Sequence, residues 1–187
     1  MPTSPPLVLT LDDFLKLPQI EESPAWEYQN GSATQKPMPK TRHSLLQKRL
    51  LAEVDAHGKI YTALPELRFT FGGRSIVPAI AVIAWARIQI NELGEPEDNF
   101  LEPPDWAIEI LSPDQKATRV IDNLLHCLKH GSQLGWMLDP DDYSILIVVP
   151  QQEFQVCRDD TQLLMLPGIT WTLTAAEVFA WLQLGKR

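Results

Sequence analysis

Glu109 is the residue whose position most clearly calls for a chemical explanation. It interrupts an otherwise apolar run from Trp106 to Leu111 that predicts a buried strand. A carboxylate in such a strand is costly to bury unless it is paired, protonated or bound to a cation. Glu109 therefore either binds a metal ion, or lies at the end of the strand and pairs with an arginine or lysine.

The sequence around Glu109 predicts alternating strands and helices of an α/β domain. Asn30-Gly31 predicts a tight turn between two N-terminal strands, because both residues accept positive backbone angles. Apolar periodicity predicts a helix from about His43 to His57 and another after Ser112-Pro113, while Thr174 predicts the cap of a last helix. The remaining predicted strands are 59–63, 66–71, 75–84, 106–111 and 134–138, followed by a C-terminal hairpin of 143–149 and 153–156.

Length and composition limit the class of protein. A chain of 187 residues, of which 44% are hydrophobic, suits one domain over residues 1–187. No apolar stretch approaches membrane-spanning length, and the first residues do not resemble a secretion signal. Cys127 and Cys157 do not show the spacing pattern of a disulfide framework, so a disulfide is not expected and a reducing compartment fits the sequence. We therefore expect a cytoplasmic protein without a membrane partner.

The charge distribution restricts any contact with nucleic acid to one region. A formal net charge of -8 argues against a surface that binds phosphates everywhere. The segment 36–49 is the exception, because it has several cationic residues and no acidic one. Either these side chains bind phosphates, or they are solvent-exposed residues at the start of a helix whose positive charges balance those of nearby acidic residues. The candidate DNA-binding residues are Lys36, Lys40, Arg42, His43 and Lys48.

The segment around Glu109 also resembles a known family. Residues 104–113, Pro-Asp-Trp-Ala-Ile-Glu-Ile-Leu-Ser-Pro, are similar to the signature of the Uma-type restriction-endonuclease-like family, in the PD-(D/E)XK nuclease superfamily. The resemblance extends over about residues 9–184. Further matches are Trp26-Glu27-Tyr28, 36–39, His43-Ser44, 65–68, Gly135-Trp136 and Asp139-Pro140.

This resemblance implies a fold, a reaction and partners. The fold would be a restriction-endonuclease-like mixed central sheet flanked by helices, of the α/β (α+β) class, with N-terminal and C-terminal β-hairpins. The reaction would be metal-dependent hydrolysis of DNA, in which two acidic residues hold Mg²⁺, or Mn²⁺, and a lysine activates or orients water. A homodimer would also fit the family.

The resemblance assigns roles to individual residues, and two positions depart from the family pattern. Glu109 matches the second acidic position, whereas Ala79 follows Pro78 where the family has its first metal-binding aspartate. A methyl group cannot coordinate a metal ion. Glu66 either replaces that ligand or forms a surface ion pair with Arg68 or with a neighbouring chain.

The lysine position of the family aligns with Asn123, which carries no charge. Lys116, and after it Arg119, are the candidates to replace the lysine, and the alternative is that both are simply exposed near the start of a helix. The sequence therefore predicts an endonuclease with a degenerate site, weak or inactive. The alternative is a non-catalytic nucleic-acid-binding or protein-interaction protein with the same fold.

Overall fold

The computed structural model describes residues 9–113 and 115–186, which contain ten strands and four α-helices. The strands are β1 (Trp26–Gln29), β2 (Ser32–Gln35), β3 (Tyr61–Pro65), β4 (Phe69–Phe71), β5 (Arg74–Ile76), β6 (Ile80–Ala84), β7 (Trp106–Ile110), β8 (Leu134–Asp139), β9 (Ser144–Val148) and β10 (Gln155–Cys157). The helices are α1 (Leu11–Phe14), α2 (Thr41–His57), α3 (Ala117–Lys129) and α4 (Ala175–Ala180), with 3₁₀ turns η1 (Pro18–Glu21), η2 (Trp85–Arg87) and η3 (Leu184–Lys186). Within this part of the chain, no helix is both long and apolar enough to cross a membrane.

The strands form two sheets. The larger sheet has six strands in the order β10-β9-β8-β7-β6-β3, and the smaller has four in the order β2-β1-β5-β4. Strands β7 and β8 run parallel, with α3 as the crossover connection that parallel neighbours need, whereas the other neighbours in the larger sheet are antiparallel. The expected mixed central sheet and both expected hairpins, β1-β2 and β9-β10, are confirmed.

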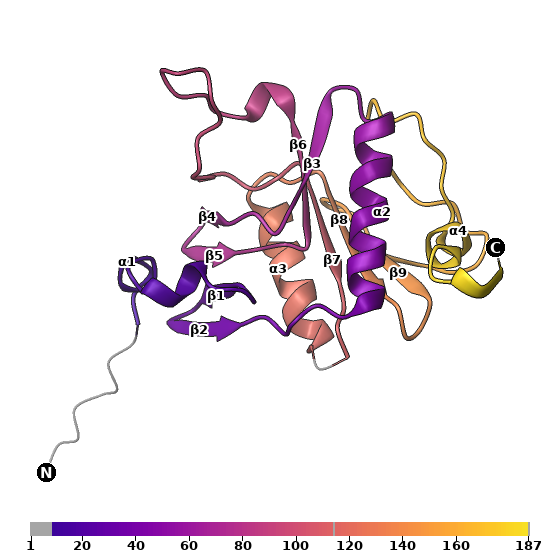
Figure 1. Cartoon of the computed structure of the whole chain (residues 1–187), viewed down its shortest axis with the longest axis horizontal. Helices are drawn as coiled ribbons and strands as arrows, with labels where there is room; N and C mark the ends of the chain where they lie inside the picture. Colours follow the sequence, from indigo (N-terminus) through magenta and orange to yellow (C-terminus); the bar gives the residue numbers. More distant parts are fainter. Residues whose placement is uncertain (1–8, 114, 187) are drawn as a thin grey trace, which may run out of the picture.

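Helices cover both faces of the six-stranded sheet. Figure 1 shows α2 across one face and α3 across the other, with the smaller sheet and α1 beside them. Residues alternate between the two faces along each strand. Ile80 and Val82 pack in the α2 cluster, whereas Ala81 and Ile83 pack in the α3 cluster. On β7, Ile108 and Ile110 belong to the α2 face, so Glu109 between them points to the opposite face.

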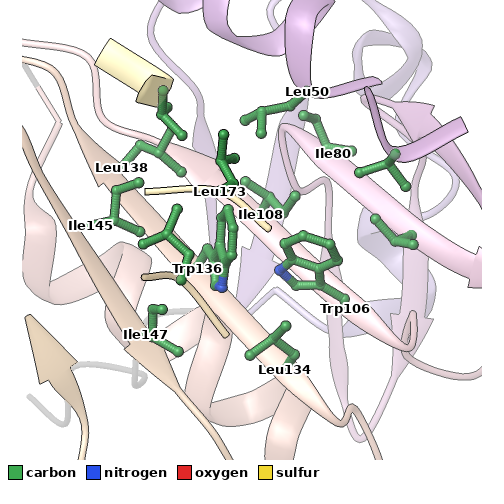
Figure 2. Close-up of a cluster of buried hydrophobic side chains, with 14 of the residues drawn as sticks. Leu50, Ile80, Trp106, Ile108, Leu134, Trp136, Leu138, Ile145, Ile147 and Leu173 are labelled. Atoms are coloured by element: carbon green, nitrogen blue, oxygen red, sulfur yellow. The ribbon is translucent and has the colours of Figure 1, made fainter. Parts of the chain in front are cut away.

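The core on the α2 face is built around two tryptophans. The rings of Trp106 and Trp136 meet edge to face, with centroids 4.6 Å apart, and both side chains are fully buried. Figure 2 shows them among aliphatic side chains from α2, the sheet and the C-terminal segment, including Leu50, Ile145 and Leu173. This packing fixes β7 and its neighbours, and therefore the backbone that carries Glu109.

The strand predicted over 59–63 lies two residues later, as β3, and two other predicted strands are wrong at the connection between the sheets. The segment 75–84 is not one strand, because Val77, Pro78 and Ala79 separate β5 in the smaller sheet from β6 in the larger one. Proline lacks the N–H that a continuous ladder requires. The segment 66–71 contains only β4, and Glu66 lies in the preceding turn with φ of +48°. Both corrections concern the connection between the two sheets.

Candidate active site

Glu109 is buried near the end of β7, with 3% of its surface exposed. Its Oε2 atom accepts hydrogen bonds from the ammonium group of Lys36 at 3.1 Å and from the backbone N–H of Ala79 at 3.4 Å. Burial raises the pKa of the Glu109 carboxyl group, and the charge of Lys36 opposes that rise. Glu109 thus pairs with a lysine near the end of its strand. A bound metal ion is therefore not needed to explain why this carboxylate is buried.

Lys36 follows the last residue of β2, and its side chain turns into the protein. Its Nζ atom donates to the carbonyl oxygen of Val77 at 2.6 Å as well as to Glu109, and only 14% of its side chain is exposed. Burial alone would lower the pKa of Lys36, but the carboxylates of Glu109 and Glu27 outweigh it and raise that pKa above its ordinary value. The ammonium form is therefore maintained at neutral pH.

Glu27, on β1, is a second buried carboxylate beside this pair, and it was not among the residues predicted for the site. It is 4% exposed, and its two oxygens accept hydrogen bonds from the backbone N–H of Val77 at 3.0 Å and from the Asn123 amide at 3.1 Å. The guanidinium of Arg119 lies 4.0 Å away. One feature of the sequence could have indicated that Glu27 is buried: it is an acidic residue flanked by Trp26 and Tyr28 in a four-residue strand.

The connection between the two sheets passes directly through this site. Glu27 binds the N–H of Val77 and Lys36 binds its carbonyl oxygen, so this residue is held from both sides. The carbonyl oxygen of Ala79 accepts from the Gln47 side chain at 2.8 Å. Ala79 itself is 1% exposed and packs with the α2 cluster. The position expected to carry the first acidic ligand thus presents a buried methyl group and a backbone N–H donor.

The other residues predicted for catalysis lie around this centre. Glu66 is exposed and lines a small cavity of about 20 Å³ together with Lys36 and His43. Such a volume is about what one water molecule needs. Lys116 is an exposed residue at the start of α3, and Arg119 donates to the Thr34 hydroxyl at 2.7 Å and approaches Glu27. Among the described cations, Lys36 is the one that forms an ion pair with Glu109.

The structure divides the five candidate DNA-binding residues into two groups. Lys36 and His43 are turned inward, whereas Lys40, Arg42 and Lys48 are exposed. Arg42 contacts the carbonyl oxygen of Pro140 at 2.9 Å and pairs with Asp141. The five residues therefore do not form one common surface, and the exposed three lie at and along the first half of α2.

His43 is a buried imidazole without a satisfied ring nitrogen. It is 8% exposed, and neither nitrogen makes a hydrogen bond of good geometry within the described part of the chain, although the backbone of Ile110 lies close to the ring. Burial, together with the nearby charge of Lys36, lowers the pKa of His43 to about 4. The ring is therefore neutral at physiological pH.

A larger groove of about 680 Å³ adjoins the small cavity and shares Ala25, Glu66 and Val77 with it. Its lining includes four carboxylates, and the guanidinium of Arg68 at its wall donates to Ile20 at 2.7 Å, Trp26 at 2.9 Å and Ser75 at 3.0 Å. The acidic lining residues are Glu21, Glu22, Glu66 and Asp98. This approach to the site is unfavourable for a DNA phosphate.

The residues present do not fit the Mg²⁺ site that the family resemblance implies. Mg²⁺ requires several oxygen ligands, but here the oxygen Oε2 of Glu109 is bound to an ammonium group and residue 79 offers none from its side chain. Throughout the described ranges, no group of three or more His, Cys, Asp or Glu side chains is arranged to hold a metal ion. The charge of Glu109 is balanced instead by the ammonium group of Lys36.

Two comparisons with known proteins return matches, and both cover most of the chain. The family model Uma2, described as "Putative restriction endonuclease", matches residues 11–176. A crystal structure from Anabaena variabilis ATCC 29413, described as "a putative nuclease belonging to DUF820", is 45% identical with a TM-score of 0.89 and covers 93% of this chain and 99% of its own. No curated protein matches the sequence. Since the family model spans far more than half of the residues, this chain belongs to the Uma2 restriction endonuclease family.

Proposed function

We propose that this protein is a member of the nuclease family in which metal-dependent DNA cleavage is weak or lost. One observation carries the proposal: Glu109 is bound by the Lys36 ammonium and the Ala79 N–H, in a site where residue 79 has no carboxylate. A divalent cation would have to displace the ammonium group and would then find one carboxylate fewer than the family pattern provides.

The charge of the surroundings supports the same proposal. The groove next to the site is lined by carboxylates, and the chain as a whole carries a net charge of -8. Both features oppose the approach of a polyanion unless a local cationic surface compensates for them. The fold, in contrast, is that of the nuclease-like neighbour over most of the chain.

A cleavage assay tests this proposal with supercoiled plasmid, linear duplex and single-stranded DNA in Mg²⁺ or Mn²⁺. We expect the native protein to cut no faster than its Glu109→Ala variant, prepared identically to control for contaminating nucleases. Binding of Mn²⁺, followed by electron paramagnetic resonance, should likewise be no tighter for the native protein than for Glu109→Ala. Efficient metal-dependent cleavage by the native protein that disappears in Glu109→Ala would overturn the proposal.

The second candidate function is DNA binding without cleavage. The observation that favours it is the exposure of Lys40, Arg42 and Lys48 at the first half of α2. Such a role needs cationic side chains near phosphates but no metal ion. It is tested by the salt dependence of binding described below.

A further inference from the structure

The outer strands of the two sheets are β3 and β10 in the larger sheet and β2 and β4 in the smaller one. Two of these edges are covered by the chain itself. At β3, Asp55 on α2 accepts a hydrogen bond from the Ala63 N–H at 2.9 Å. At β4, the Thr70 N–H donates to the carbonyl oxygen of Phe100 at 2.9 Å. These contacts occupy backbone donors that would otherwise be available to a strand of another molecule.

Strand β10 has an open edge beside large apolar side chains. Within residues 9–113 and 115–186, its backbone forms hydrogen bonds to the backbone of β9 and of no other segment. Phe154, just before the strand, is 69% exposed, and Val156 is 45% exposed. The remaining outer strand, β2, contains no large apolar residue. The edge of β10 therefore combines unpaired backbone groups with exposed apolar surface, which favours pairing with another strand.

Phe154 and Val156 are directed to one face of the sheet. Val156 pairs with Leu146 of β9, which belongs to the cluster on the α3 face. Because side chains alternate along a strand, Phe154, two residues earlier, is directed to the same face. Cys157 packs in the cluster on the opposite, α2 face. A partner strand at this edge would therefore meet two apolar side chains in a row on the α3 face.

A second copy of this chain presents the side chains that this edge requires. Two antiparallel β10 strands related by a two-fold axis through Gln155 place Phe154 of each copy opposite Val156 of the other. An aromatic residue opposite a β-branched one is a favourable cross-strand pair. If the axis passed through Val156 instead, Glu153 would lie opposite Asp159, and these like charges would repel each other. The sequence of this edge thus favours one partner and one register.

We propose that this protein forms a two-fold symmetric dimer in which β10 pairs with β10 of a second copy and joins the two six-stranded sheets into one. A two-fold axis that pairs antiparallel strands runs perpendicular to the sheet, so both α3 helices lie on the same face of the joined sheet. Glu109 points to that face, and both candidate sites therefore lie on one side of the dimer. The inference does not depend on DNA cleavage, because it rests on the sheet edge and not on the site.

Substitutions at the two apolar positions test the partner and the register together. Phe154→Lys combined with Val156→Lys places like charges opposite each other across the axis, whereas Phe154→Lys combined with Val156→Glu places opposite charges there. Both double variants remove the same apolar surface. The matched control is Ile90→Lys combined with Leu93→Lys, because these residues are 68% and 83% exposed in the segment between β6 and β7. Sedimentation velocity over a range of concentrations measures association, and circular dichroism verifies folding.

We expect the native protein and the Ile90→Lys, Leu93→Lys control to dimerise with the same dissociation constant. Phe154→Lys with Val156→Lys should raise that constant by about tenfold or more, and Phe154→Lys with Val156→Glu should recover part of the loss. Hydrogen exchange of the outward-facing β10 amides should slow as the concentration of the native protein rises, because strand pairing protects them.

A cross-link tests the position of the axis while the apolar pair is retained. A residue on the axis faces its own copy, so Gln155→Cys should form an intermolecular disulfide under mild oxidation. In the same register the two copies of residue 153 lie about 13 Å apart along the strands, too far for a disulfide, and Glu153→Cys is the matched control. The native Cys127 and Cys157 are buried and should not react.

The proposal is overturned if the native protein remains monomeric at every concentration, which would leave this edge to a strand of a different protein. It is also overturned if a folded Phe154→Lys, Val156→Lys variant dimerises as well as the native protein, because the interface then lies elsewhere. Equal weakening by both double variants would show that the register is wrong. If the double variants do not fold, the cross-links decide: Glu153→Cys linking as readily as Gln155→Cys contradicts the proposal.

Discussion

The ammonium group of Lys36 and the carboxylate of Glu109 form a buried ion pair at 3.1 Å, with 14% and 4% of the two side chains exposed. Removal of one partner leaves the other as an uncompensated buried charge. Lys36→Met should therefore lower the free energy of unfolding by about 3 to 5 kcal/mol in urea titrations at pH 7. The combined Lys36→Met, Glu109→Gln variant should lose less free energy of unfolding than the sum of the losses of the two single variants.

Arg42→Met is the control, because the Arg42–Asp141 pair is exposed and should contribute less than about 1 kcal/mol. Equal losses for Lys36→Met and Arg42→Met would contradict the assignment of a buried pair.

Glu27 should contribute to stability through the backbone that it holds. In Glu27→Gln one oxygen is replaced by an amide donor, which then faces either the Val77 N–H or the Asn123 amide. An unsatisfied buried donor costs about 1 to 3 kcal/mol, and we expect a loss in that range. Glu66→Gln makes the same chemical change at an exposed residue and should alter the free energy of unfolding by less than about 0.5 kcal/mol. The measurement is chemical denaturation of both variants under one set of conditions.

His43 should make the protein sensitive to mild acid. Its pKa is about 4 in the folded protein against 6.5 as the ordinary value, so the unfolded chain takes up the proton first as pH falls. The stabilising effect of the neutral ring is complete above about pH 6.5 and is lost progressively between about pH 6.5 and 4. Between about pH 7 and 4.5 the native protein should lose about 2 kcal/mol more than His43→Asn. His126, whose pKa is also lowered chiefly by burial, is the comparison: His126→Asn should retain the part of the pH dependence that His43 causes.

DNA affinity, if the second candidate function is correct, should fall steeply with salt concentration. Replacement of Lys40, Arg42 and Lys48 together by alanine should reduce the slope of log affinity against log salt by about one for each phosphate that is no longer neutralised. Fluorescence anisotropy with a labelled duplex measures both quantities, and Lys129→Ala controls for the removal of any exposed cation. Binding that is absent, or that does not depend on salt, would exclude this function.

The fold follows closely from local patterns in the sequence. Helices α2, α3 and α4 and strands β7 and β8 were predicted because apolar periodicity, caps and short strand lengths all agree along these segments. The break at Val77 to Ala79 was missed because the whole segment from Ser75 to Ala84 is rich in β-formers, and only pairing with different neighbours assigns its halves to different sheets.

The candidate site was predictable only in part. Glu109 was identified because a carboxylate in an apolar strand is costly, and its burial at 3% agrees with that reasoning. The sequence could not predict where the Lys36 side chain points. A lysine in a basic stretch has the same local sequence whether it faces solvent or a buried carboxylate 73 residues away in the chain. Glu27 was missed for a related reason: burial of both Glu27 and Tyr28 breaks the alternation expected of a hairpin with one solvated face.

The double attachment of the Val77 backbone also has a consequence for dynamics. Glu27 and Lys36, which hold its N–H and carbonyl oxygen, both belong to the segment from β1 to the residue after β2. Any fluctuation that lifts this hairpin from the six-stranded sheet must release both bonds, and exposes the Val77 amide proton to solvent at the same time. The hydrogen-exchange rate of that single amide should therefore report how often the site opens, in the absence of DNA or metal.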